Sequence, residues 1–162
     1  MLTRRALLLT GTTALAAAAT APARAAGSAK TFEITLSEAE WKKRLTPAQF
    51  AVLRKEDTER AGSSPLNAEK RAGTFHCAGC DLAVYPSSTK FESGTGWPSF
   101  YAPIEGAVAT REDRKLVFLT RTEVHCRRCG GHLGHVFDDG PKPTGLRHCL
   151  NGVALSFKPA AA

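Results

Sequence analysis

The chain has 162 residues, a formal net charge of +7 and a charged fraction of 23%. This length suits one domain with a single hydrophobic core. The charge is modest, and basic and acidic residues are interleaved, so the composition gives no reason to expect a nucleic-acid-binding protein.

The first 25 residues are predicted to be an export signal that lies outside the folded domain. Arg4 and Arg5 form a basic start, residues 6–20 are small and weakly apolar, and Ala23-Arg24-Ala25 offers a signal-peptidase site. The paired arginines favour the twin-arginine route and therefore a periplasmic location. The apolar run is too short and too interrupted for a membrane anchor, so no stable membrane insertion is expected.

Removal of the signal would leave 137 residues, in which 19 basic residues face 15 acidic ones for a formal charge of +4. These residues are divided into a small-residue linker at 26–33, a folded domain at 34–158 and a tail at 159–162.

Two short helices are expected at the start of the folded domain. Ser37 and Glu40 form an S-x-x-E capping box, which marks the start of the first helix. Thr46-Pro47 begins the second helix, because proline is tolerated in a first turn. The turn-forming residues 62–65 are expected to end it.

Short strands are expected in the rest of the domain. Apolar stretches bounded by glycine and proline predict strands at 73–77, 82–85, 107–110, 116–120, 122–125, 135–137 and 152–157. Residues 111–114, with the sequence Arg-Glu-Asp-Arg, are predicted to form a hairpin turn between two of them. Many short strands of this kind favour a mainly β fold, an antiparallel sandwich or barrel.

The five cysteines divide into two pairs and a single residue. Cys77 and Cys80 form one C-x-x-C knuckle, Cys126 and Cys129 form a second, and Cys149 stands alone. Two such knuckles can place four thiolates around one tetrahedral Zn²⁺. Because 45 residues separate the knuckles, this zinc would join distant hairpins and stabilise a small β domain.

Other readings of the knuckles remain open. An exported chain could form disulfides instead of a metal site. One pair could have a thioredoxin-like redox role, although no βαβ pattern surrounds either. His76 and His125, which each precede a knuckle cysteine, could also serve as metal ligands or could simply be strand residues.

A second group of residues has the chemistry of a reactive site. Arg147 lies two residues before Cys149 and would favour its thiolate form. His132 and His135 could bind a second metal or act as a general acid beside a thiolate. Trp97, in a glycine-rich loop, offers a rigid apolar wall to a ligand.

These motifs together resemble the peptide-methionine sulfoxide reductase B family. The matching blocks are G-W-P-S-F at 96–100, H-L-G-H-V-F at 132–137, D-D-G-P at 138–141, R-H-C-L-N at 147–151 and both knuckles. The resemblance extends from Ile34 to Phe157. It implies two antiparallel sheets with leading helices, and a catalytic domain at 34–158 that reduces the R epimer of methionine sulfoxide in oxidised peptides or proteins.

The resemblance also implies roles for individual residues. The thiolate of Cys149 would attack the sulfoxide sulfur and become a sulfenic acid, the first step of cysteine oxidation. His135, together with His132, would lie beside the sulfoxide oxygen and protonate it. Trp97 would pack on the substrate methyl group. Asn151 would orient the histidine and the substrate.

Arg147 would favour the thiolate in the same scheme. The four knuckle cysteines would hold one structural zinc, and they are Cys77, Cys80, Cys126 and Cys129.

Thr95 marks a departure from the family pattern. Many members carry a cysteine at this position, and that cysteine normally closes a disulfide with the oxidised nucleophile. A threonine cannot do so, so we expect a one-cysteine cycle in which an external thiol reduces Cys149. A thioredoxin-like domain or a small thiol would be the partner, and the chain is expected to be a monomer.

Two rival functions remain at this level. A zinc hydrolase could use His132, His135 and Cys149 as catalytic ligands. A zinc-ribbon binding module would be a non-enzymatic alternative, against which the export signal, the modest charge and the unpaired thiol all argue.

Overall fold

The computed structural model describes residues 32–116 and 119–161. The predicted export signal, including the paired arginines, and most of the predicted linker lie outside these residues. Across the described ranges, no helix combines the length and the apolar content needed to cross a membrane.

The two predicted helices lead the domain. Helix α1 comprises Glu38–Arg44 and α2 comprises Pro47–Lys55. Each begins with a capping box: the Ser37 side chain accepts from the Glu40 amide, and the Thr46 side chain accepts from the Gln49 amide, with the reciprocal bonds also present. These caps satisfy amide groups that have no partner inside a helix, and the start of both helices is therefore confirmed.

Helix α2 ends earlier than predicted. Glu56 takes a left-handed conformation, with φ 58° and ψ 38°, and its amide donates to the carbonyl oxygens of Ala51 and Val52. A non-glycine residue thus supplies the conformation that commonly closes a helix, so the chain leaves α2 before Gly62 is reached. The residues released from the helix, 57–63, instead form a loop that contributes Thr58 and Glu59 to the site described below.

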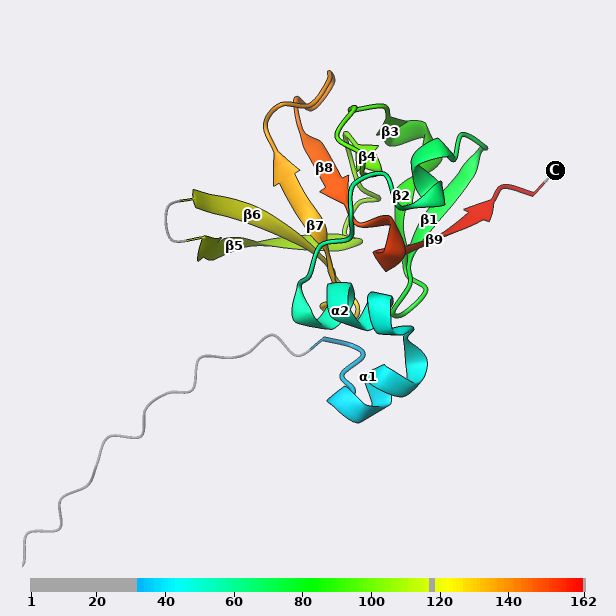
Figure 1. Cartoon of the computed structure of the whole chain (residues 1–162). Helices are drawn as coiled ribbons and strands as arrows, with labels where there is room; N and C mark the ends of the chain where they lie inside the picture. The colour runs from blue at the N-terminus through cyan, green and yellow to red at the C-terminus, as the bar shows by residue number, and fades with distance from the viewer. Residues whose placement is uncertain (1–31, 117–118, 162) are drawn as a thin grey trace, which may run out of the picture. The chain divides into compact units, whose positions relative to one another are not determined.

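The strands form two antiparallel sheets, as predicted (Figure 1). The smaller sheet has the order β2-β1-β9, and its strands are β1 (Gly73–Cys77), β2 (Ala83–Pro86) and β9 (Leu155–Pro159). The larger sheet has the order β3-β4-β8-β7-β6-β5. Its strands are β3 (Lys90–Phe91), β4 (Ser99–Phe100), β5 (Val108–Leu116), β6 (Leu119–Cys126), β7 (His132–Phe137) and β8 (Arg147–Leu150). Short 3₁₀ helices occur at Pro65–Ala68, Ser87–Thr89 and Gly152–Ala154.

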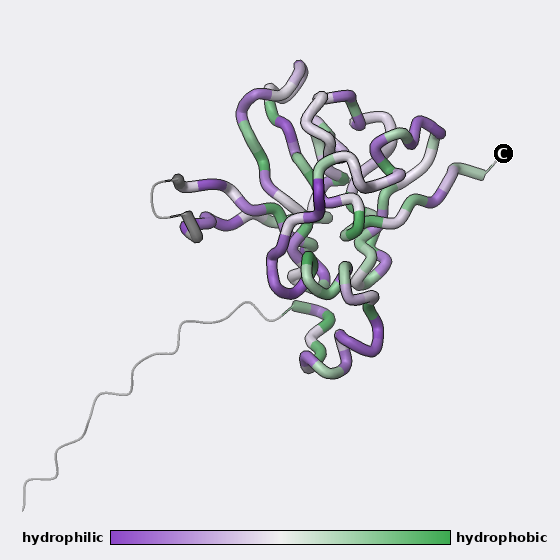
Figure 2. Tube along the Cα trace, viewed as in Figure 1, coloured by the Kyte–Doolittle hydropathy of each residue, from purple (hydrophilic) through white to green (hydrophobic). Residues whose placement is uncertain are grey.

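Aromatic side chains join the two sheets in the core. Phe75 of β1 meets Phe100 of β4 edge to face, with ring centroids 4.9 Å apart. Tyr85 of β2 also packs on Phe100, at 4.7 Å, and all three side chains are fully buried. Offset and edge-to-face pairs of this kind add to the energy of apolar burial. The arm formed by β5 and β6 is largely hydrophilic in its described part (Figure 2).

The predicted hairpin turn at 111–114 is wrong, because these residues lie inside β5. Arg111 pairs across the sheet with Glu123, and Asp113 pairs with Arg121. Two of the four charged groups that suggested a turn therefore find opposite charges on the neighbouring strand. Strand β6 begins at Leu119, so the connection falls at residues 117–118, outside the described part of the chain.

The C-terminal part of the domain also differs from prediction. The expected strand at 152–157 begins instead as a 3₁₀ helix, Gly152–Ala154, and only then becomes β9. The amides of Gly152 and Val153 donate to the carboxylate of Glu59, which bends the chain at this point. Strand β8 was not predicted, and β9 continues to Pro159, one residue into the predicted tail.

Candidate active site and metal site

Strand β8 divides its four residues between two environments. The side chains alternate along the strand, with His148 and Leu150 buried in the core and Arg147 and Cys149 half-buried on the opposite face. This alternation follows from the two-residue period of a β-strand. The thiol of Cys149 is therefore directed away from the core that the two sheets share.

The sheet register aligns other functional groups with this thiol. Cys149 lies directly opposite Ser99 of β4 and opposite His135 of β7. His135 in turn lies opposite Glu123 of β6, and Glu123 lies opposite Arg111 of β5. Directly paired residues point to the same face of a sheet. A thiol, an imidazole, a carboxylate and a guanidinium thus form one row across the larger sheet.

A cavity of about 180 Å³ opens at Cys149. Its lining residues come from the loop after α2, the glycine-rich loop and strands β6, β7 and β8: Thr58, Trp97, Arg121, Gly134, His135, Phe137, Cys149, Leu150 and Asn151. This volume suits one side chain of a ligand better than a whole ligand molecule. A larger cavity of about 550 Å³ lies between α2 and the 3₁₀ helix at Gly152–Ala154, but neither a cysteine nor a histidine lines it.

His135 is oriented by a carboxylate. Its Nε2 atom lies 2.8 Å from Asp113 Oδ2, and Arg121 donates to the same oxygen at 2.7 Å. A neutral ring therefore donates its Nε2–H to Asp113 and carries its lone pair on Nδ1. Burial lowers the pKa of His135, and the hydrogen bond to Asp113 opposes that effect without cancelling it.

His132 belongs to a second, more deeply buried group. Its Nδ1 atom lies 2.8 Å from Glu123 Oε1, and Arg111 donates to the other oxygen of that carboxylate. Burial opposes ionisation of Glu123, but hydrogen bonds from His132 and Arg111 lower its pKa overall. The two imidazole rings are 5.3 Å apart, and of the two only His135 lines the cavity.

Arg147 lies beside Cys149 and is fixed by two contacts. Its Nε and Nη2 atoms each donate to Asp139 at 2.8 Å, and its guanidinium stacks on the ring of Phe137, 4.4 Å from the centroid. Asp139 is the largest cause of the raised pKa of Arg147, and interaction with Cys149 adds to it. The positive charge therefore stays close to the sulfur of Cys149.

Trp97 and Asn151 are both held by the backbone of Glu59. The indole Nε1–H of Trp97 donates to the carbonyl oxygen of Glu59 at 3.1 Å, and the amide of Glu59 donates to Asn151 Oδ1 at 3.0 Å. Asn151 Nδ2 donates in addition to the carbonyl oxygen of Leu133. This role of Glu59 was not predicted from the sequence, because its contacts to Trp97 and Asn151 are made through the backbone and join residues at least 38 positions apart.

His148 neither contacts solvent nor assists the thiol. It is 5% exposed, and its Nδ1 atom lies 3.0 Å from the hydroxyl of Tyr85 in the core. Burial lowers its pKa, which keeps the ring neutral at physiological pH. The two-residue period of β8 therefore places His148 on the face opposite Cys149.

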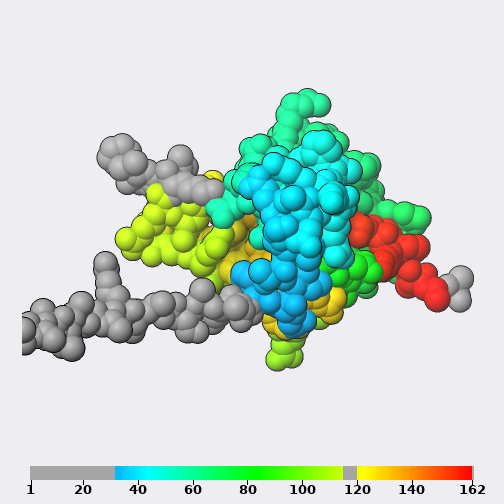
Figure 3. Space-filling model, turned by 90° about the horizontal axis from the view of Figure 1, so that it is seen from below, coloured from blue at the N-terminus to red at the C-terminus, as the bar shows by residue number. Residues whose placement is uncertain are grey.

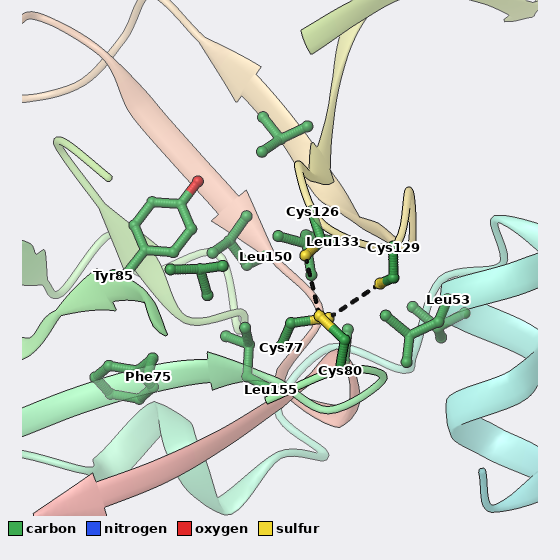
Figure 4. Packing of buried hydrophobic residues seen from close by; sticks show 14 of the residues in the cluster. Leu53, Phe75, Cys77, Cys80, Tyr85, Cys126, Cys129, Leu133, Leu150 and Leu155 are labelled. Carbon is green, nitrogen blue, oxygen red and sulfur yellow. Dashed lines mark hydrogen bonds between the residues drawn. The ribbon is translucent and has the colours of Figure 1, made fainter. Parts of the chain in front are cut away.

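The four knuckle cysteines meet at one point, as predicted. Their sulfur atoms all lie within 4.8 Å of one another, and the residues are buried. The Sγ atoms of Cys77 and Cys129 are 3.7 Å apart, and those of Cys80 and Cys126 are 3.5 Å apart (Figure 4). Four thiolates around a tetrahedral zinc would be about 3.8 Å apart, whereas a disulfide bond measures about 2.05 Å. The four sulfurs therefore form a cage that could hold a metal ion.

The surroundings of this four-cysteine cage are consistent with a buried ion. Leu53 of α2 covers it (Figure 4), and Arg54 donates to the carbonyl oxygen of Cys129. Figure 3 shows the two helices lying over this end of the domain. Hydrogen bonds to Cys126 and Cys129 are the largest causes of the raised pKa of Cys77. Four thiols this close cannot all ionise unless a cation compensates their charge.

The described residues contain one group of side chains with metal-ligand geometry, and it is the four-cysteine cage. His76 bonds instead to the carbonyl oxygen of Asp81, and His125 packs against the ring of Phe32. Neither histidine joins the cage, so the strand reading of both residues holds. The set His132, His135 and Cys149, which a zinc hydrolase would need, is not among the groups found in these ranges.

Sequence reasoning missed the charged partners of the histidines. Asp113, Arg121 and Glu123 carry no motif of their own, and the assignment of 111–114 to a turn removed Asp113 from the sheet. The available signal was the alternation of charge along 111–113 and 121–123. Strands with that period place Arg111 and these three side chains on one face of the sheet, the face that also carries His135.

The chain is similar to known proteins over most of its length. Residues 45–159 match the model of the SelR domain. The chain is 54% identical over 120 residues to the peptide methionine sulfoxide reductase MsrB of Pseudomonas putida (strain W619), covering 74% of this chain and 90% of that protein. It is 46% identical over 127 residues to the MsrB of Leptospira interrogans, covering 78% and 97%.

A plant protein has a comparable sequence identity to this chain. The chain is 53% identical over 123 residues to the chloroplastic peptide methionine sulfoxide reductase B1 of Arabidopsis thaliana. The match covers 76% of this chain but only 61% of the plant protein's length.

Removal of one cage ligand is expected to release the metal. In Cys126→Ser, three thiolates would remain, and loss of the ion should lower stability by about 3 kcal/mol and the Tm by roughly 10 °C. Metal analysis and thermal unfolding measure both effects. Cys149→Ser is the matched control, since it changes a cysteine outside the cage. Equal metal content in Cys126→Ser and the unsubstituted protein would contradict the cage.

Replacement of Asp113 is expected to change the titration of His135. Asp113→Asn removes the charge that holds the pKa of His135 up and leaves Arg121 without that carboxylate. The protonated imidazole should therefore be lost at a lower pH than in the unsubstituted protein. NMR titration of the ring measures this directly. Asp138→Asn, on the exposed side of the same region, is the control, and an unchanged His135 midpoint in Asp113→Asn would contradict the assignment.

Proposed function

The chain belongs to the SelR-domain family of peptide methionine sulfoxide reductases B, and we propose that it reduces methionine-R-sulfoxide in peptides and proteins. The observation that carries the proposal is the pairing of Cys149 with His135 on the cavity wall, with Asp113 hydrogen-bonded to the imidazole from behind the cavity lining. It combines a nucleophile, a proton donor and a group that orients the donor.

The cavity dimensions fit the side chain of one methionine sulfoxide. Trp97 supplies an apolar wall for the methyl group, and His135, the strand partner of Cys149, supplies a polar group. At about 180 Å³ the cavity is smaller than the roughly 300 Å³ at which sites for whole ligands usually begin. The side chain would therefore enter alone, with the rest of the peptide outside, which suits a repair enzyme that acts on many sequences.

In the proposed reaction the oxygen passes from the substrate to the enzyme. The thiolate of Cys149 attacks the sulfoxide sulfur and forms an S–S bond, and protonated His135 donates its Nδ1–H to the sulfoxide oxygen as the S–O bond breaks. The hydroxide released then attacks the sulfur of Cys149 and breaks the S–S bond. The substrate sulfur gains two electrons and leaves as methionine, while the sulfur of Cys149 loses two and becomes a sulfenic acid. Asp113 stabilises the imidazolium during this step.

Regeneration of Cys149 would depend on an external thiol. Thr95 Oγ1 lies 3.8 Å from Cys149 Sγ, so the position of the resolving cysteine found in many relatives is held here by a hydroxyl. The other four cysteines of the sequence belong to the buried cage. One thiol would form a mixed disulfide with Cys149 and release water, and a second would release Cys149 as a thiol and leave as a disulfide.

We also propose a structural metal, an external reductant, a cellular location and an oligomeric state for the enzyme. The four-cysteine cage would hold one structural Zn²⁺, which would join the turns of the two sheets without taking part in the reaction. The reductant would be a thioredoxin-like domain or a small thiol. The signal pattern in the first 25 residues supports export to the periplasm by the twin-arginine route, and the chain would act as a monomer.

The stereochemical assignment is tested with a blocked methionine sulfoxide. With dithiothreitol as reductant, the enzyme should consume the R epimer and leave the S epimer unchanged, as measured by chiral chromatography. Cys149→Ser should lower kcat/KM by at least about a thousandfold, because no other group in the cavity can attack sulfur. Consumption of the S epimer alone, or an unchanged R epimer, would refute the proposed activity.

The one-cysteine cycle is tested by a single turnover without reductant. Mass spectrometry should find Cys149 as a sulfenic acid that a dimedone probe traps. Thr95→Cys should instead give an intramolecular disulfide and faster recycling by thioredoxin, since the side chain at 95 already contacts Cys149. A disulfide between Cys149 and a cage cysteine in the unsubstituted enzyme would exclude the one-cysteine cycle.

A further inference from the structure

Three hydroxyl groups form a chain that ends at the sulfur of Cys149. Thr95 Oγ1 lies 3.8 Å from Cys149 Sγ and 2.9 Å from Ser93 Oγ. Ser93 Oγ lies 2.7 Å from Ser99 Oγ, and Ser99 can donate to the carbonyl oxygen of Trp97 at 3.2 Å. Ser99 is 1% exposed and is the direct strand partner of Cys149. We call this set, Ser93, Thr95 and Ser99, the hydroxyl chain.

The surrounding loop holds Thr95 in place. Gly94 and Gly96 both have left-handed backbone conformations, with φ 73° and 90°, which other residues rarely adopt. The carbonyl oxygen of Gly96 accepts from the Gly62 amide at 2.7 Å and from Asn67 Nδ2 at 2.9 Å. The contact between Thr95 and the sulfur is therefore supported by two segments that lie outside the loop.

The hydroxyl chain can serve both ionisation states of the sulfur. When Cys149 is a thiol, its S–H donates to Thr95 and each hydroxyl donates to the next, ending at the carbonyl oxygen of Trp97. When the sulfur is ionised, the donors reverse, and Thr95 donates to it. Each hydroxyl has one proton and can accept from a neighbour, so the contacts from the sulfur to Ser99 serve both directions, whereas the bond from Ser99 to the carbonyl oxygen of Trp97 is made only in the first. Aligned donors in such a chain strengthen one another.

We propose that the hydroxyl chain is a positioning device that stabilises the anionic forms of Cys149, the thiolate before turnover and the sulfenate after it. The proposal rests on the one-cysteine cycle described above. In that cycle the oxidised sulfur has no partner thiol within the protein and must persist until an external thiol arrives. Thr95 would then hold a hydrogen bond on the sulfenate.

This hydrogen bond has two chemical consequences. Before turnover, it adds to Arg147 in favouring the thiolate, and so raises the fraction of enzyme ready to attack. After turnover, it draws electron density from the sulfenate sulfur. Oxidation of that sulfur to the sulfinic acid by a peroxide, with transfer of one more oxygen and two more electrons, should therefore be slower.

Alkylation of the resting enzyme tests the first consequence without any substrate. The iodoacetamide reaction of Cys149 in Thr95→Val should be about tenfold slower at neutral pH, which is the scale of one charge-assisted hydrogen bond. The rates should converge at alkaline pH, where both thiols are ionised. Thr95→Ser retains the hydroxyl and should remain within about twofold of the unsubstituted enzyme. Thr110→Val, on the exposed face of β5, is the matched control for the substitution itself.

Over-oxidation tests the second consequence. After treatment with hydrogen peroxide, mass spectrometry should show sulfinic acid at Cys149 forming several-fold faster in Thr95→Val than in Thr95→Ser. Equal rates in the two variants, in either experiment, would overturn the proposal. Neither measurement needs methionine sulfoxide, so failure here differs from failure of the proposed function, which the epimer assay reports.

Discussion

The four-cysteine cage is the constraint on which the site depends. Cys77 ends β1 in the smaller sheet, and Cys126 ends β6 in the larger one, so the cage ties one sheet to the other at their turns. The chain that leaves the second knuckle becomes β7, which carries His135. Two joined knuckles thus determine where β7 starts against β6. A slip of one residue there would turn His135 and Cys149 to opposite faces, because strand side chains alternate.

Charge pairs between β5 and β6 then orient the two histidines of β7. Asp113 and Glu123 each bind one histidine and one arginine, and each carboxylate is almost fully enclosed. A buried carboxylate without such partners would be costly, so the arginines stabilise the acids that orient the imidazoles. The two groups differ in exposure. His135 lines the cavity, while His132 lies behind it, so they have unequal access to a ligand.

Features that depend on neighbouring residues could be predicted from the sequence, whereas features that depend on contacts between distant residues could not. The capping boxes, both knuckles, Cys149, His135 and Trp97 were identified because each depends on residue types at short spacing. Asp113 and Glu59 were not, since their roles depend on which strand or loop lies next to them. The error at 111–114 has the same origin: four charged residues in a row suggest a turn unless the opposite charges on β6 are known. Cys149 was identified although its strand, β8, was not predicted, because the reactivity of a thiol does not depend on secondary structure.

In the proposed cycle, the size of the cavity sets the order of methionine release and thiol binding. About 180 Å³ suits one side chain, so in this cycle methionine leaves before a reducing thiol reaches Cys149. The oxidised enzyme therefore exists free of substrate for as long as a reductant takes to arrive. A resolving cysteine at position 95 would remove that interval by attacking from within the cavity wall. With Thr95 there, the interval remains, and the sulfenate is exposed to further oxidation throughout it. The same residue that makes the enzyme depend on an outside thiol is thus placed to protect the intermediate during the delay.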